Sequence, residues 1–293
     1  MMSAKEVLAQ DNDIWLDKWH RTLGQTFNDQ AQTIDSWFAT QPSQDAGASG
    51  KIRLGWEPRS TDWAEFDTRF RIKFTLPSLK NRVDLLLSDD EDETLDNTIK
   101  TSREVDSQRQ NATLALRFFS PRFDNVTYRI GFGRRDQVFA RATYRDFYTF
   151  NPKATLLYDT QLYYYNRDRW GSEVGASLLY ERSGKILDRL NHRWLYSDID
   201  DRFKWRFEAQ RYTRLGPQST WVNTLFVSGF SKPNMHTEQI LLSTKLRSNP
   251  LRKWLFFEIE PFVLWLKRED FKATYGLALR FEAFYGADAN RNF

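Results

Sequence analysis

The chain has 293 residues, no cysteine and a formal net charge of +4, with 43 Lys and Arg against 39 Asp and Glu. Disulfides, thiolate metal sites and a cysteine nucleophile are therefore excluded, and the dispersed basic residues argue against nucleic acid as a partner. Aromatic residues make up 16% of the chain although the mean hydropathy is only −0.67, and no apolar run reaches the roughly 18 residues of a membrane-spanning helix.

An amphipathic helix is predicted over residues 13–38, with Asp13 as a suitable N-cap. Apolar residues recur at three- to four-residue steps and form one stripe, consisting of Trp15, Trp19, Leu23, Phe27, Ala31, Ile34 and Phe38. The stripe packs on another part of the chain, or else it lies on a membrane surface or docks a partner. Residues 41–50 (QPSQDAGASG) are predicted to be a flexible linker.

From Lys51 onward, apolar residues recur at every second position, which is the period of a β-strand with one apolar and one polar face. Between residues 64 and 76, for example, the even positions are Ala, Phe, Thr, Phe, Ile, Phe and Leu, whereas every odd position from 65 to 73 is charged. About fourteen such segments are found, at 51–58, 63–76, 82–88, 112–119, 127–134, 137–147, 153–165, 170–181, 187–197, 203–213, 218–230, 237–247, 254–267 and 271–285.

Alternation of this kind over so many segments predicts an all-β protein, a transmembrane antiparallel up-and-down β-barrel with an N-terminal amphipathic helix. Two segments are short or irregular, so twelve strands is the alternative to fourteen. Tryptophans near the predicted strand ends fit an interfacial girdle; they are Trp56, Trp63, Trp170, Trp194, Trp254 and Trp265.

The predicted connections alternate in length along the chain. The joints at 77–81, 120–125, 149–152, 183–184, 215–217 and 249–250 are compact and rich in turn residues, whereas residues 88–111 form a long acidic connection. Short turns at one end and long loops at the other are typical of the periplasmic and extracellular ends of such barrels. Residues 89–110 could fold inward as a constriction or remain a solvated extracellular loop, and the solvated loop is the favoured alternative.

The last predicted strand contains Thr274, Gly276, Leu279 and Phe281, a polar residue, a glycine two positions on and two later apolar residues. This pattern resembles the C-terminal assembly signal of bacterial outer-membrane β-barrel proteins, a porin-like class. The resemblance implies recognition by the outer-membrane assembly machinery, a location in the outer membrane of a Gram-negative bacterium, and contact with outer-membrane lipids and lipopolysaccharide. One departure is the polar tail that follows the final aromatic strand residues.

The chain is accordingly divided into a periplasmic segment with helix and linker (1–50), a barrel (51–286) and a short C-terminal tail (287–293). Residues 1–10 show no apolar secretory segment, so the location presupposes a natural leader that has been replaced ahead of the doubled Met1-Met2. A periplasmic or lipoprotein partner is the candidate that would dock on the N-terminal helix.

If the polar face of each strand points inward, the lumen is densely ionic. The candidate lumen-lining residues are Arg53, Glu65, Asp67, Arg69, Arg71, Lys73, Arg117, Arg129, Arg141, Arg145, Asp159, Glu173, Arg206, Glu208, Glu258, Glu260, Arg280 and Glu282. Arginines dominate the inward positions of residues 112–147, while the 254–267 strand contributes acidic residues. Two alternatives follow: the lumen is an open pore with a transverse electric field across it, or a network of salt bridges fills it.

Three classes of function follow. A channel for small polar or anionic solutes is the leading hypothesis, because barrels of about fourteen strands are wide enough to hold water. A partner-binding or scaffold barrel would use the helix and the acidic loop. A barrel hydrolase is least favoured, because His20, His192 and His236 have no Ser neighbour at strand spacing; no enzymatic activity, metal site or cofactor is expected.

Overall fold

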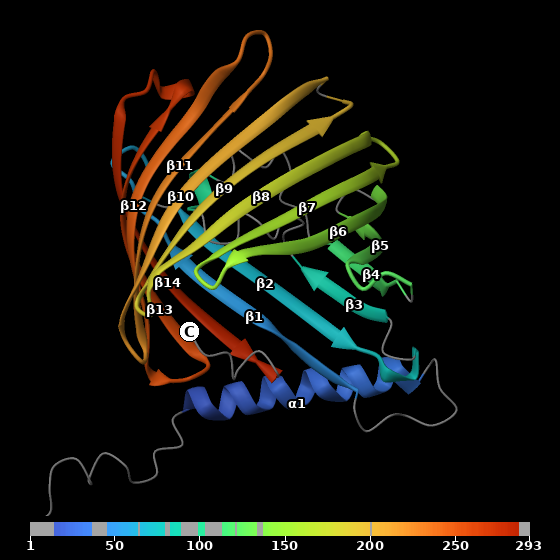
Figure 1. The fold of residues 1–293 in the computed structure, drawn as a ribbon. Coiled ribbons are helices and arrows are strands. Elements are labelled where there is room, and N and C mark those ends of the chain that lie inside the picture. The colour runs from blue at the N-terminus through green and yellow to red at the C-terminus, as the bar shows by residue number, and fades with distance from the viewer. Residues whose placement is uncertain are drawn as a thin grey trace, which may run out of the picture.

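The computed structural model describes residues 15–36, 46–63, 65–79, 83–88, 99–102, 113–120, 122–133, 137–199 and 201–286. Within these ranges, fourteen strands form one closed antiparallel barrel, in which every strand pairs with its sequence neighbours and β1 pairs with β14 (Figure 1). The predicted barrel of fourteen strands with an N-terminal helix is confirmed, and the alternative of twelve strands is wrong.

The strands differ widely in length. They are β1 (Gly47–Trp56), β2 (Phe66–Thr75), β3 (Val83–Ser88), β4 (Thr113–Phe119), β5 (Val126–Gly133), β6 (Gln137–Asn151), β7 (Ala154–Tyr165), β8 (Arg169–Ser183), β9 (Ile186–Ser197), β10 (Arg202–Gly216), β11 (Ser219–Phe230), β12 (His236–Arg252), β13 (Leu255–Leu266) and β14 (Ala273–Tyr285). Short 3-10 helices, η2 (Pro77–Leu79) and η4 (Lys267–Glu269), follow β2 and β13.

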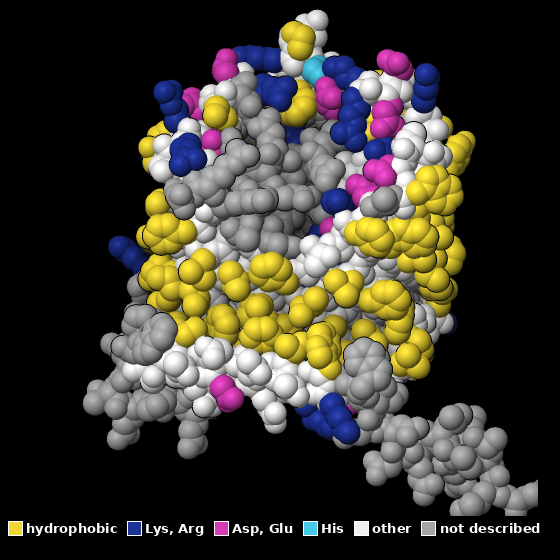
Figure 2. Space-filling view, turned by 180° about the vertical axis from the view of Figure 1, so that it is seen from behind, with side chains coloured by type: hydrophobic (Ala, Val, Ile, Leu, Met, Phe, Trp, Pro, Cys, Tyr) yellow, Lys and Arg dark blue, Asp and Glu magenta, His cyan; other side chains and the backbone are white. Residues whose placement is uncertain are grey.

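Alternation within each strand separates an apolar outer face from a polar inner face. Phe66, Phe132 and Tyr275 lie on the outside, with 64%, 63% and 64% of their surface exposed. On the face seen in Figure 2, apolar side chains form a belt across the barrel, while charged side chains gather toward one rim. So many exposed aromatic rings would be unfavourable in water, and hydrocarbon is the surrounding that suits them.

Short turns gather at one end of the barrel. The connections at 152–153, 184–185, 217–218 and 253–254 have two residues each, whereas 57–65, 89–112 and 267–272 connect strands at the opposite end. One predicted turn is wrong: the chain does not turn at Asn249-Pro250, because β12 continues through a register shift to Arg252 and turns after it. Extension of β12 by these residues places Arg252 at the end of the barrel, within reach of the helix.

Helix α1 (Trp15–Ser36) packs on the outside of the barrel, near the short turns (Figure 1). Ala31 is fully buried against Ala48, Ile72, Phe74 and Tyr285. These strand residues alternate with side chains that point into the barrel, so the helix covers outer positions of β14, β1 and β2. The first alternative for the apolar stripe, packing within the chain, is the one observed. Among the described residues, no helix is long and apolar enough to cross a membrane.

Polar and aromatic contacts fix the helix across the seam between the first and last strands. The His20 ring stacks on Trp254 with centroids 4.1 Å apart, and its Nε2 lies 2.8 Å from the carbonyl oxygen of Phe284. Phe27 stacks on Tyr285 at 5.0 Å. Two nitrogens of the Arg252 guanidinium, Nε and Nη2, donate to the Asp17 carboxylate, the closest pair at 2.7 Å. The helix therefore joins β1 to the β12–β14 side of the barrel.

Two details of the predicted N-terminal segment differ from the structure. Strand β1 begins at Gly47, inside the stretch predicted to be a linker, because the amide of Ala48 is held by Asn28 Oδ1 of the helix at 2.9 Å. Trp19 leaves the buried stripe and is 41% exposed. The predicted cap Asp13, the stripe residue Phe38, the side chain of Trp15 and the tail 287–293 lie outside what the structure describes, and the domain division stays a prediction.

Candidate functional site

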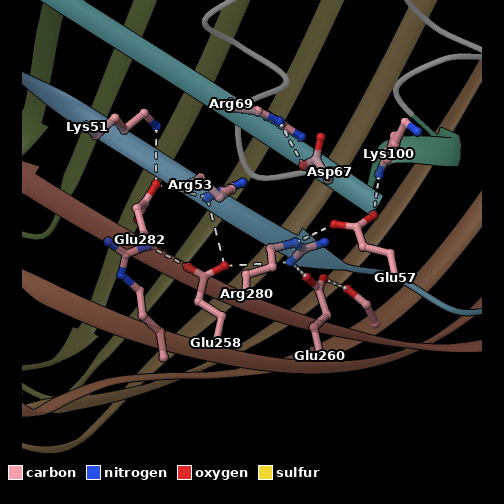
Figure 3. Close-up of polar contacts among 12 residues, drawn as sticks. Lys51, Arg53, Glu57, Asp67, Arg69, Lys100, Glu258, Glu260, Arg280 and Glu282 are labelled. Carbon is pink, nitrogen blue, oxygen red and sulfur yellow. Dashed lines mark hydrogen bonds and ion pairs between the residues drawn. The ribbon is translucent and has the colours of Figure 1, made fainter. Parts of the chain in front are cut away.

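A network of buried ion pairs crosses the inner wall from β12 to β1 (Figure 3). Arg280 of β14 is its centre: its Nε donates to Glu57 at 2.6 Å, and its Nη1 bonds Glu260 and lies 3.6 Å from Glu258. The Arg280 and Glu57 side chains are each no more than 1% exposed. Removing so many charges from water is tolerated only because each has partners of opposite sign.

The same network extends toward the short turns through Glu282. Its carboxylate lies 2.7 Å from Arg247, 3.2 Å from Arg53 and 3.4 Å from Lys51, and Arg247 also bonds Glu258 at 2.5 Å. The acidic residues predicted to form a negative wall are thus paired with arginines of the adjacent strands. On this wall the acidic residues form a salt-bridge network and do not form an open acidic surface.

A second cluster lies across β7, β8 and β9. Arg193 bonds the half-buried Asp159 at 2.6 Å and also bonds the buried Glu173, and burial of the Arg193 guanidinium is compensated by the two carboxylates around it. Arg193 was not among the predicted lumen residues, nor were Glu57 and Asp84. All three occupy the same alternating positions as the predicted residues, so their parity was the signal that could have identified them.

The remaining predicted residues also lie on the inward positions of their strands. Asp67 bonds Arg69 at 3.0 Å, Arg117 bonds Asp84 at 2.6 Å, and Arg141 donates to Tyr165 Oη at 2.9 Å. Arg129 stands in register between Arg117 and Arg141. Arg145 faces Asp159 across the β6–β7 pair, Arg206 is buried on β10 and Glu208 follows it. Their role in solute passage stays a prediction.

A cavity of about 900 Å³ occupies the lumen near the short turns. Residues of the β8–β9 turn, the start of β1 and the end of β10 all line it, which places it at that end of the barrel. Eight Lys and Arg face two Glu around it; they are Lys51, Arg71, Lys73, Arg117, Lys185, Arg214, Lys245 and Arg247, against Glu181 and Glu282. Such an excess of one sign in a concave, low-dielectric space attracts anions.

The half of the lumen nearer the long loops is lined differently. Inward positions of β11 to β14 carry an apolar patch, defined here as Phe226, Leu241, Phe262, Leu264, Leu266 and Ala278. Ile99, from the connection between β3 and β4, packs into this patch and is 1% exposed. The described part of that connection, 99–102, therefore folds inward. The expectation of a wholly solvated loop is wrong for these residues, because burial of Ile99 on an apolar wall outweighs the hydration of its neighbours; the acidic run 89–93 lies outside the described residues.

A solved bacterial channel shares the fold of this barrel. The outer membrane channel DcaP of Acinetobacter baumannii matches over 82% of this chain and 97% of its own, with a TM-score of 0.51 and 7% identity. The chain has a porin-like fold. Further matches are OccK11 (OpdR) of Pseudomonas aeruginosa (10% identity, 83% and 96% coverage, TM-score 0.45) and the KdgM porin in complex with disordered oligogalacturonate (7%, 81% and 99%, 0.41). No family model and no curated protein matches the sequence.

The residues predicted to form an assembly signal all lie on β14. Thr274 and Gly276 point inward, and the Phe262 ring fills the space above Gly276, where a Cβ would collide with it. Leu279 and Phe281 point outward, and Phe281 is 51% exposed. The strand pairs with β13 and with β1, so it forms one side of the closure. Recognition of these residues by an assembly machinery stays a prediction.

The three histidines of the porin-like barrel lie away from the cavity. His20 is bound in the helix contact, His192 stacks on Trp194 on the outer face at 5.4 Å, and His236 contacts Glu238 at 2.7 Å and the Asn234 carbonyl oxygen at 2.5 Å. None of them is among the residues that line the cavity. A hydrolase site built on histidine thus gains no support from this arrangement.

Proposed function

We propose that the protein is an outer-membrane channel that passes small polar solutes and prefers anions. The observation that carries this proposal is the cavity of about 900 Å³ in the lumen, around which eight basic residues face two acidic ones. Attraction of anions into such a space raises their local concentration and their rate of passage. The porin-like fold and the apolar outer belt are consistent with a Gram-negative outer membrane as its location.

The paired charges on the β12–β1 wall sharpen this proposal. Glu258, Glu260 and Glu282 are all held by arginines, so they do not offer free carboxylates to a passing cation. Among the lining residues, Lys185 lies in the β8–β9 turn and Arg214 lies near the end of β10, where a solute from the short-turn side would meet them first. Selection then takes place at the short-turn end.

The test is a reversal-potential measurement on the full chain in planar bilayers separating unequal KCl concentrations. An anion-selective channel gives a reversal potential toward the chloride equilibrium value. A reversal potential of zero, a reversal potential shifted toward the potassium equilibrium value, or the absence of any conductance would overturn the proposal.

Deletion of the N-terminal helix distinguishes the scaffold hypothesis from the channel hypothesis. Phe27, Ala31 and Ile34 pack against the barrel, so the apolar face predicted to dock a partner is occupied by the chain itself. Removal of residues 1–36 leaves the sequence of every strand intact; a channel retains its selectivity after this removal, whereas a scaffold loses its partner. A periplasmic or lipoprotein partner would have to use the remaining face of the helix.

A further inference from the structure

The turn formed by residues 99–102 is bound to the inner wall at four points. Besides the burial of Ile99 in the apolar patch, the Lys100 amide donates to Glu57 Oε2 at 2.6 Å and Thr101 Oγ1 donates to Glu65 Oε2 at 2.5 Å. Gln239 Nε2 donates to the Ser102 carbonyl oxygen at 2.9 Å. The wall thus provides an apolar pocket, two acceptors and one donor that together match this turn.

Glu57 belongs both to this binding site and to the ion-pair network. Its Oε2 accepts the Lys100 amide, while its Oε1 accepts the Arg280 guanidinium (Figure 3). Arg280 continues the chain of contacts to Glu258, which Arg247 bonds, and Arg247 bonds Glu282. Arg247 and Glu282 line the basic cavity. Contacts therefore run without a break from the cavity to the turn.

We propose that this ion-pair chain couples the two halves of the lumen, so that an anion bound in the basic cavity weakens the hold of the wall on the turn 99–102. The inference rests on the proposed function, because it assumes that anions enter the cavity. It names the regulation of that site: the solute itself widens the path at the long-loop end.

The physical argument follows the sharing of arginines. An anion near Arg247 competes with Glu282 and Glu258 for its guanidinium. The carboxylates that lose Arg247 draw on Arg53 and Arg280, which lie 3.2 Å and 3.6 Å from them. Each shift of Arg280 toward Glu258 weakens its contact with Glu57, and a buried carboxylate without its cation is unfavourable. Glu57 then reorients, and the Lys100 amide loses its acceptor.

Coupling of this kind is reciprocal, because two ligands that bias one equilibrium affect each other equally. An anion that releases the turn must bind more tightly when the turn is already loose. Ile99→Ala removes the apolar anchor without touching the cavity or the ion pairs. We expect it to bind inorganic phosphate about five-fold more tightly than the unmodified chain, at the lower end of typical coupling.

The experiment records single channels of the full chain in planar bilayers in KCl, with inorganic phosphate added on both sides. Phosphate is expected to raise the KCl conductance of the unmodified channel. Ile99→Ala should start from the higher conductance and show no further rise. Glu57→Gln removes the charge that links turn and network, and its conductance should not respond to phosphate although phosphate still binds.

Arg214→Gln is the matched control, because Arg214 lines the cavity but lies outside the chain of contacts from Arg247 to Glu57. It should weaken phosphate binding and retain the full rise at saturating phosphate. An equal response in Glu57→Gln and the unmodified chain, or phosphate acting in both only as a blocker, overturns the inference. Either result can occur in an anion-selective channel, so failure of this inference does not contradict the proposed function. Reversal potentials from the same recordings test the proposed function independently. Far-UV circular dichroism checks that each variant is folded.

Discussion

The two halves of the lumen differ in what fills them, although the same strands form both. Toward the short turns, basic side chains surround an open cavity of about 900 Å³. Toward the long loops, six apolar side chains close around Ile99. On β12 the change takes four residues, from Lys245 at the cavity to Leu241 in the apolar patch, which is about 13 Å along a strand. Alternation decides which positions face inward, and the choice of residue at those positions decides whether water or the chain itself occupies the space.

The boundary between the halves is the ion-pair network, and its loss should have the largest effect. Arg280→Ala leaves Glu57, Glu258 and Glu260 without their shared cation in the buried wall. Removal of one partner from a buried pair typically costs about 3–5 kcal/mol. We expect a decrease of that order in the free energy of unfolding, measured by urea titration of the barrel in lipid vesicles with tryptophan fluorescence.

Arg211→Ala is the control for this variant. Arg211 pairs with Asp188 at 2.7 Å on the outer face, close to the β8–β9 turn at the rim of the barrel, and its side chain is 48% exposed. Exposed pairs contribute little, so no measurable change is expected. If the two arginine variants behaved alike, the difference between a buried boundary and an exposed surface pair would not hold.

The filled half is tested by an inward leucine and its outward neighbour. Leu264→Ala truncates a fully buried side chain of the apolar patch, whereas Leu242→Ala truncates a side chain that is 50% exposed on the outer face. Removal of a buried leucine side chain leaves a cavity and costs about 2–5 kcal/mol. The same urea titration should give this loss for Leu264→Ala and a much smaller loss for Leu242→Ala. Equal losses would show that the patch is no better packed than the lipid-facing surface.

The open half is tested by reversing one charge on each side of a single turn. Lys185 lines the cavity, while Arg182, two residues before the intervening Gly184, points outward toward Asp188. Lys185→Glu should lower the chloride-to-potassium permeability ratio about five-fold, corresponding to roughly 1 kcal/mol for a charge a few ångströms from the ion in water. Arg182→Glu should leave the ratio unchanged. Bilayer reversal potentials measure both, and a shift with Arg182→Glu would place the selecting charges outside the lumen.

The number of strands and the side of the barrel that each residue faces were predictable from the sequence, because the two-residue period is a local pattern that does not depend on which strands pair. The period marks inward positions such as Arg53 and Glu258 as well as Arg193, and only pairing of strands shows that Arg53 stands next to Glu282. Closure of the barrel is what brings residue 53 beside residue 282. The network, unlike the alternation, therefore could not be derived from local pattern.

Two other features depended on contacts between distant segments. Ile99 lies in a polar connection, and nothing local distinguishes it from a solvated residue; its burial follows from an apolar patch assembled by four strands. Gly50 lies in a stretch that resembles a linker, yet a Cβ there would collide with the backbone carbonyl of Arg71 on β2, and Tyr285 Oη would lie 2.6 Å from it. The close approach of the β2 backbone to β1 needs a glycine there, so a residue typical of flexible linkers serves a strand.

The smallest effect is expected at the helix that covers the outer face beside the open half. The hydrogen bond from Arg252 lowers the pKa of Asp17 below its ordinary value of 3.8. A carboxyl group with a lowered pKa stabilises the folded form above its unfolded-state pKa, and this contribution disappears as the pH falls through the folded-state pKa. Protection of the α1 amides from hydrogen exchange, relative to intrinsic rates, should therefore fall slightly between pH 5 and pH 3. Asp17→Asn, which cannot gain or lose this charge, should lower protection at pH 5 and abolish that part of the pH dependence. The remaining protection, held by the Phe27–Tyr285 stack and the buried Ala31, should not change with pH; if the variant kept the full pH dependence, the pair with Arg252 would not be what fastens the helix to this end of the barrel.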